Sequence, residues 1–219
     1  AVRLGEVFAY DATGAALPAT LEVTATGTRI VLDGAALAAA RYPVTVDPEI
    51  GANDFRISDL GGTGDASYDA YSAAVAYNAI DDEYLVVWKG DDNVGGLVDN
   101  EYEVFGQRLD AATGAEVGSN DFRISDMGGT GDANFDAWEP AAAYNATDNE
   151  YLVVWRGDDN VAGLVDDEYE VFGQRLDAAT GAEIGSNDFR ISDLGGTGDV
   201  IYGAFITAVT YNAADNEYL

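Results

Sequence analysis

The chain has 219 residues, of which 40 are acidic and 10 are basic, so its net charge is -30. This charge repels nucleic acid phosphates and anionic lipid surfaces, and neither is expected as a partner. There is no Cys and no His, which excludes disulfides, thiolate or imidazole metal ligands and the commonest general base. No apolar run reaches the length of a membrane span, so no membrane insertion is expected.

Residues 1–50 are rich in Ala, Val and Thr and poor in aromatic residues, which indicates a small β domain or its C-terminal part. Alternating apolar residues and turn signals predict short strands and one short helical turn. The expected elements are a strand over Val2–Tyr10, a hairpin of Leu21–Ala25 and Arg29–Leu32 around Thr26-Gly27, a helical turn within Ala35–Ala40, a strand over Arg41–Val46 and a linker over residues 47–51.

Residues 51–219 form a second region, in which the sequence repeats every 67 residues from Asn53 onward. The heptapeptide Asn53–Asp59 recurs at Asn120–Asp126 and at Asn187–Asp193. A tandem array of this kind is read as one supersecondary unit that cannot cover its own apolar faces alone. Two copies are complete and a third is partial, over residues 53–119, 120–186 and 187–219.

Each copy is predicted to hold four strands and no helix, because Gly, Asp and Asn turns separate short apolar runs. The second strand contains small residues, as in Ala73–Ala76, which suits a crowded position near a common axis. The third strand, Glu83–Lys89, is apolar on both sides, which suits a sheet stacked between two neighbours. We therefore expect an all-β fold with tandem four-stranded antiparallel blades, forming an incomplete β-propeller. In the first copy the expected strands are 54–58, 72–77, 83–89 and 102–109.

Several segments resemble known repeats. The segments are Tyr77-Asn78-Ala79 with Glu83–Trp88, then Glu103–Asp110 and Asp54–Ser58. They are similar to repeats of large secreted bacterial β-propeller proteins, over Asn53–Leu219. Residues 17–19 and 41–48 similarly resemble the end of a β domain that precedes such repeats. The resemblance implies an extracellular setting and a non-catalytic scaffold, although the insertion over residues 90–100 departs from a short-bladed propeller.

Two repeated loops carry candidate metal ligands. Calcium takes six to eight oxygen ligands, and glycines in both loops allow the backbone to fold around an ion. The spacing does not match an EF-hand, and the alternative is a solvated acidic loop or a turn whose Asp accepts backbone hydrogen bonds. The candidate ligands are Asp91, Asp92, Asn93, Asp99, Glu101, Asp158, Asp159, Asn160, Asp166 and Glu168 in the acidic loops, and Asp59, Asp65, Asp69, Asp126, Asp132 and Asp136 in the glycine-rich loops.

Aromatic residues recur at two repeat positions. Tyr71, Trp138 and Phe205 share one position, and Trp88 and Trp155 share the other. Such rings can stack on sugars, but core packing is the simpler explanation at strand positions.

The sequence favours a non-enzymatic extracellular or cell-surface scaffold that self-assembles, with calcium as a candidate stabilising ion. Two and a half blades do not close a ring, so we expect further repeats or neighbouring subunits to complete a ring, a filament or a surface array. The alternative is an adhesin-like module that binds polysaccharide or protein through repeated weak sites. A glycoside hydrolase is a third hypothesis because a carboxylate pair needs only geometry, but the chain has no nucleophile motif and no sialidase-like Ser-x-Asp-x-Gly-x-Thr-Trp box.

Overall fold

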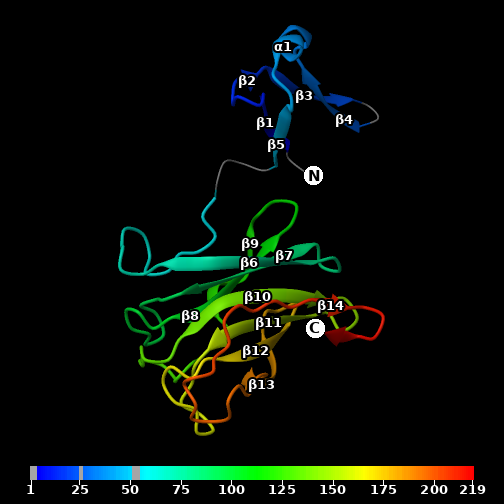
Figure 1. Ribbon diagram of the computed structural model, residues 1–219. Coiled ribbons are helices and arrows are strands. Elements are labelled where there is room, and N and C mark those ends of the chain that lie inside the picture. Colours follow the sequence, from blue (N-terminus) through cyan, green and yellow to red (C-terminus); the bar gives the residue numbers. More distant parts are fainter. Residues whose placement is uncertain (1–3, 25–26, 51–54) are drawn as a thin grey trace. The chain divides into compact units, whose positions relative to one another are not determined.

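A computed structural model describes residues 4–24, 27–50 and 55–219 (Figure 1). The chain divides into two compact units, Ala1–Phe55 with Ala112–Gly114, and Arg56–Ala111 with Ala115–Leu219. It is 43% strand and 3% helix, which confirms the all-β prediction. Among the described residues, no helix is long and apolar enough to cross a membrane.

The N-terminal unit contains the first expected strand, the hairpin and the helical turn, but the strand expected over Arg41–Val46 begins only at Thr45. β1 (Leu4–Tyr10) lies between β2 (Ala16–Leu17) and β5 (Thr45–Ile50) in one sheet, and β3 (Ala19–Thr24) pairs with β4 (Gly27–Leu32). The Asp33 side chain caps α1 (Gly34–Ala39) by accepting a hydrogen bond from the Ala36 N–H at 2.8 Å.

The predicted linker is wrong over residues 47–50. These residues belong to β5, in which Asp47 pairs with Phe8 and Ile50 pairs with Leu4. They extend the sheet because β1 offers them an edge to which their backbone groups can bond. Gly51, Val2 and the predicted turn residue Thr26 lie outside the described residues.

The repeat region contains two four-stranded antiparallel sheets in which strands that follow one another in the chain are neighbours (Figure 1). The third copy contributes a short hairpin. The first sheet is β6 (Ala70–Asn78), β7 (Glu83–Gly90), β8 (Glu103–Asp110) and β9 (Glu116–Arg123); the second is β10 (Ala137–Asn145), β11 (Glu150–Gly157), β12 (Glu170–Asp177) and β13 (Glu183–Arg190); the hairpin is β14 (Tyr211–Asn212) and β15 (Glu217–Tyr218).

The four-stranded sheets do not begin and end where the predicted copies do. The first strand of the first copy was expected over residues 54–58, but residues 55–58 form no strand, and Asp54 lies outside the described residues. The equivalent residues of the second copy end β9, where Phe122 pairs with Gly106 of the preceding sheet. The prediction was therefore wrong in placing this segment, which forms the last strand of one sheet and not the first strand of the next. A short connection from β8 makes antiparallel pairing with β8 the local choice.

Consecutive sheets pack face to face. β10 contacts β6 and β7 of the first sheet. Leu85 and Val87 on β7 share one buried cluster with Tyr151, Val153 and Trp155 on β11. Apolar faces of neighbouring copies thus cover each other, as the two-sided apolar strand predicts. No closed ring is formed by the part of the chain that the structure describes.

Candidate functional site

The acidic loop after β7 is held closed by its own carboxylates. Asp91 is buried, and its two oxygens accept hydrogen bonds from the N–H groups of Asp69 and Asn100 at 3.0 and 2.9 Å. Asp158 makes the equivalent two bonds in the second copy, both at 2.9 Å. Since buried N–H groups need acceptors, these carboxylates replace ladder bonds that the loop cannot form.

A second carboxylate joins the acidic loop to the glycine-rich loop of the same copy. Asp92 Oδ1 accepts from the Gly61 N–H at 2.9 Å, and Asp159 Oδ1 accepts from the Gly128 N–H at 3.1 Å. Asn160 adds a bond from its side-chain amide to the Gly128 carbonyl oxygen at 2.8 Å. The two predicted loops of each copy therefore meet at one place.

Glu101 and Glu168 connect consecutive copies. Glu101 Oε2 accepts from the Val98 N–H at 2.9 Å, and its Oε1 accepts from the N–H of Gly131 in the next copy at 2.7 Å. Glu168 makes the same pair of contacts, reaching Gly198 in the third copy at 2.8 Å. The carboxylate thus bridges the repeat boundary in both places.

Asp136 reaches across the same boundary in the opposite direction. Its Oδ1 accepts from the Tyr102 N–H at 3.1 Å, and burial raises the pKa of Asp136 to about 6. In the third copy Gly203 stands at this position.

The other predicted ligands lie nearer the surface. Asn93, Asp99 and Asp166 are exposed on the outer part of the acidic loops. The remaining side chains of the glycine-rich loops contact neighbours in their own copy: Asp59 pairs with Arg56 at 2.6 Å, Asp126 pairs with Arg123 at 3.1 Å, Asp69 accepts from the Tyr71 hydroxyl at 2.8 Å, Asp65 accepts from the Ser67 N–H at 3.0 Å and Asp132 accepts from the Asn134 N–H at 3.2 Å.

Within residues 4–24, 27–50 and 55–219, no group of three acidic side chains is arranged to hold a metal ion. A calcium site built from the acidic loop alone stays a prediction. The alternative of a solvated acidic loop is wrong for the carboxylates that are buried and accept backbone hydrogen bonds, which are Asp91, Asp92, Glu101, Asp158, Asp159 and Glu168. In the glycine-rich loops, Asp65, Asp132 and Asp136 accept backbone hydrogen bonds, as the alternative for those loops predicts.

Sequence reasoning missed Asp121 and Asp188, which occupy one repeat position. Burial raises the pKa of both carboxyls, that of Asp188 to about 7. The signal in the sequence was the acidic residue retained within each Asn-Asp-Phe-Arg segment, where a strand was expected to carry only structural residues.

The only lysine of the chain is enclosed by aromatic rings. The Lys89 ammonium lies 3.7 Å from the ring centre of Tyr102 and 3.1 Å from that of Trp138. Burial lowers the pKa of Lys89 to about 8, against the opposing effect of Asp136. Arg156 stands at the same position of the second copy, with its guanidinium carbon 5.7 Å from the Trp138 ring centre. Trp138 therefore has cationic side chains of two copies beside it.

Aromatic residues at the two repeat positions have different environments. Trp88 and Trp155 are buried, as core packing predicts. Tyr71 and Phe205 are exposed instead, and Trp138 is half-buried. The expectation of core packing was therefore wrong for the position of Tyr71 and Phe205, because it lies at the end of β6 and in the partial third copy, where few residues cover it.

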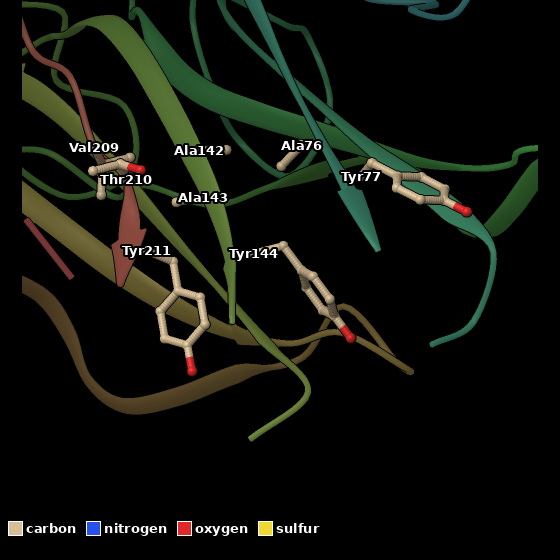
Figure 2. A pocket seen from close by; sticks show the side chains of 8 residues that line it. All are labelled: Ala76, Tyr77, Ala142, Ala143, Tyr144, Val209, Thr210 and Tyr211. Atoms are coloured by element: carbon tan, nitrogen blue, oxygen red, sulfur yellow. The ribbon is translucent and has the colours of Figure 1, made fainter. Parts of the chain in front are cut away.

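A groove of about 330 Å³ crosses the three copies (Figure 2). Tyr77, Tyr144 and Tyr211 occupy one repeat position and line it, together with Ala76, Ala142, Ala143, Val209 and Thr210. Each tyrosine hydroxyl donates to a turn residue of its own copy: Asp82 at 2.8 Å, Asn149 at 2.7 Å and Asn216 at 2.9 Å. The alanines leave the space between the tyrosines open.

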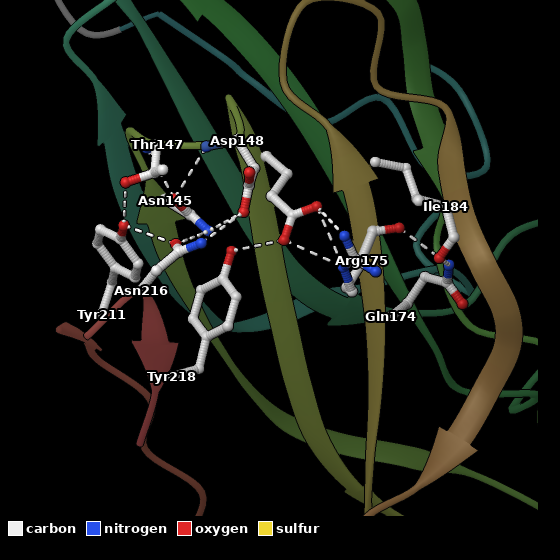
Figure 3. Close-up of polar contacts among 10 residues, drawn as sticks. Asn145, Thr147, Asp148, Gln174, Arg175, Ile184, Tyr211, Asn216 and Tyr218 are labelled. Carbon is white, nitrogen blue, oxygen red and sulfur yellow. Dashed lines mark hydrogen bonds and ion pairs between the residues drawn. The ribbon is translucent and has the colours of Figure 1, made fainter. Parts of the chain in front are cut away.

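Figure 3 shows the polar contacts that join the second and third copies. Asn216 donates to Asp148 Oδ2 at 3.1 Å and accepts from the Asn145 amide at 3.1 Å. The Tyr218 hydroxyl donates to Glu150 at 3.4 Å, and Glu150 also pairs with Arg175.

The first of these contacts repeats at the boundary between the first and second copies. There Asn149 donates to Asp81 Oδ2 at 3.2 Å. Arg108 adds another contact by donating to the Ala178 carbonyl oxygen at 3.0 Å.

No protein-family model, curated protein or solved structure matches this chain.

Proposed function

We propose that the chain is a non-enzymatic structural module of an extracellular or cell-surface scaffold, in which four-stranded sheets stack as the blades of a β-propeller-like array. The observation that carries this proposal is the repetition of the joints. Glu101 and Glu168 bridge successive boundaries in the same way, and so do Asn149 and Asn216. Buried carboxylates and partly or fully exposed amides thus make the same contacts at successive boundaries, which favours the stacking of near-identical units.

The outer face of the first sheet supports association with further repeats or subunits. Tyr84 is 39% exposed, whereas Tyr151 at the same position of the second sheet is fully buried by the first sheet. Val75 is 60% exposed, whereas Ala142 at its position packs against the buried cluster. The same sheet face is thus covered in one copy and open in the other.

A further sheet of the same kind is the complementary occupant for this open face. Such a sheet comes from additional repeats or from a neighbouring subunit, and gives a closed ring or an extended filament. An unpaired sheet edge and an open apolar face both favour association with a further sheet.

The test is light scattering coupled to size-exclusion chromatography over a range of concentrations. We expect wild-type protein to form species larger than one chain, and Val75→Glu to shift it toward the monomer by placing a charge on the open face. Val94→Glu is the matched control, since Val94 is 65% exposed in the acidic loop after β7. A wild-type chain that stays monomeric at all concentrations would contradict assembly.

Carbohydrate binding is the second candidate, because Tyr71 is exposed and Tyr102 and Trp138 are half-buried beside it. Exposed aromatic rings flanked by carboxylates suit stacking on sugar rings. Retention on immobilised polysaccharides that is lost in Tyr71→Ala would support this function, and equal retention of wild type and variant would contradict it.

A further inference from the structure

The hairpin turn that joins β6 to β7 recurs between β10 and β11 and between β14 and β15. One position of this turn holds Asp82 in the first copy, Asn149 in the second and Asn216 in the third. All three residues have a positive φ, of 55°, 52° and 57°. In each case the side-chain Oδ1 accepts a hydrogen bond from a tyrosine hydroxyl of its own copy, at 2.8, 2.7 and 2.9 Å. The three side chains are therefore held in the same way.

In the second and third copies this residue contacts the preceding copy. Asn149 donates its side-chain amide to Asp81 Oδ2 at 3.2 Å. Asn216 donates in the same way to Asp148 Oδ2 at 3.1 Å (Figure 3). Each of these aspartates also accepts from an asparagine amide of its own copy, at 2.8 and 3.1 Å. Each contact thus pairs an amide donor with a carboxylate acceptor on the copy before it.

Asp82 reverses this chemistry at the open face of the first sheet. Its Oδ1 accepts the tyrosine bond, so its Oδ2 stands where Asn149 and Asn216 carry the amide nitrogen. The Asp82 side chain is exposed. An ionised carboxylate only accepts hydrogen bonds, whereas an amide nitrogen donates them. A sheet that stacks on this face must therefore offer a donor at the position of Asp81 and Asp148.

A second copy of this chain does not offer such a donor. The acceptor position holds Asp81, Asp148 and Asp215 in the three copies. Asp215 is held like the other two, since its Oδ2 accepts from the Asn212 amide at 2.9 Å. The third copy of one chain, stacked on the open face of another, would bring Asp215 against Asp82. Two like charges opposite each other repel, and neither carboxylate donates to the other.

Tyr71 marks a second place on the open face where a positively charged partner fits. It has the repeat position of Trp138, whose ring centre lies 3.1 Å from the ammonium of Lys89 in the preceding copy. Tyr71 is 46% exposed, and the ammonium of Lys89 lies 5.3 Å from its ring centre. A lysine or arginine of a stacked sheet would therefore find an aromatic ring here, as Lys89 does at Trp138.

We propose that Asp82 is a specificity residue of the open face, which selects a sheet that carries Asn, Lys or Arg in place of the repeated aspartate. This selection rests on the proposed function, the stacking of further sheets, and adds the chemistry of the sheet that fits. The net charge of -30 favours a donor or a cation over another carboxylate at this contact. Head-to-tail association of identical chains is weakened by the same residue, because Asp215 then faces Asp82.

The experiment is sedimentation velocity of the purified chain over a range of concentrations, which gives the dissociation constant of self-association. Asp82→Asn restores the donor of the two internal contacts, and we expect it to lower the dissociation constant about fivefold. Asn149 and Asn216 adopt the same positive φ as Asp82, so this variant should fold. Asp215→Asn places the donor on the other side of the contact and should also lower the dissociation constant. Combining both changes removes the carboxylate acceptor, so the double variant should gain less than the product of the two single effects.

Asp166→Asn is the charge-matched control, because it removes an exposed carboxylate from the loop after β11, at the opposite end of that strand from Asn149. Its dissociation constant should match that of the wild type within about twofold. If the wild type assembles and Asp82→Asn binds no more tightly than Asp166→Asn, the role of Asp82 is overturned while stacking stands. Assembly of Asp82→Asn without assembly of the wild type would support that role. Monomers at all concentrations in the wild type and every variant would overturn both stacking and selection.

Discussion

Gly128 has a φ of +68°, and a Cβ on it would lie 2.5 Å from the Phe135 ring. The adjacent Gly129 also has a positive φ, of +81°, but has open space around it. Two features can require glycine at a position, namely a left-handed backbone conformation and the close approach of a neighbouring side chain. Gly128 has both features, and Gly129 has only the first. The turn itself was predictable from the Gly-Gly pair, whereas the contact with Phe135 was not.

We predict that Gly128→Ala lowers the free energy of unfolding by about 3 kcal/mol and Gly129→Ala by about 1 kcal/mol, since only the first adds overpacking to left-handed strain. Urea unfolding followed by tryptophan fluorescence measures both. Equal losses would mean that Phe135 moves aside at no cost.

Lys89 gives a pH-dependent prediction. Its pKa is lowered to about 8 by burial, so between pH 8 and 10.5 the unfolded chain binds a proton that the folded chain lacks. The contribution of Lys89 to stability must therefore rise with pH through this window. We expect the free energy of unfolding of the wild type, minus that of Lys89→Met, to increase from pH 7 to pH 10. A constant difference would show that the aromatic rings keep the ammonium at its ordinary pKa.

At the scale of elements, the local sequence pattern predicted the strands well, but it predicted less well which strands share a sheet. The alternation of Glu83–Lys89 located β7, and Gly-Asp turns located the ends of β8. The segment around Phe122 was assigned to the wrong sheet, because a repeating sequence does not show where each structural unit starts. The segment pairs with β8, which is the nearest strand with a free edge.

The candidate sites were likewise predictable only in part. Composition indicated which loops are acidic, and Asp91 and Asp92 proved to be buried in them. Which segments the carboxylates join depends on contacts between residues about 30 or 60 positions apart, such as those of Asp159 and Asp188. The order of residues along the chain contains no signal for such pairs.

A substitution of Glu101 tests how much the contact between the first and second copies contributes to stability. We predict that Glu101→Ala lowers the free energy of unfolding by about 1–3 kcal/mol, because it removes a buried carboxylate and leaves the N–H groups of Val98 and Gly131 without their acceptor in partly buried contacts. Glu116→Ala removes an exposed carboxylate at the opposite end of β8 and should change stability by less than about 0.5 kcal/mol. Matching losses in the two variants, measured by urea unfolding, would argue that the bridge contributes nothing.

At the scale of the whole molecule, the two sheets are alike in fold but not in burial. Tyr151 is enclosed and Tyr84 is not, although the two residues stand at the same position of the repeat. Identical sequence therefore has unequal environments, and the difference is removed when another sheet covers the first one. This inequality supports association of the first sheet with a further sheet, in addition to the repeated contacts at the boundaries between copies.

We propose that sheets of this kind continue to stack beyond those in the described residues. Electron microscopy of the purified protein at micromolar concentration tests it most directly. We predict rings or filaments whose repeating unit is one four-stranded sheet, and their loss in Val75→Glu. Uniform particles of the size of one chain, with Val75 and Tyr84 open to solvent, would contradict the proposal that further sheets stack on the first one.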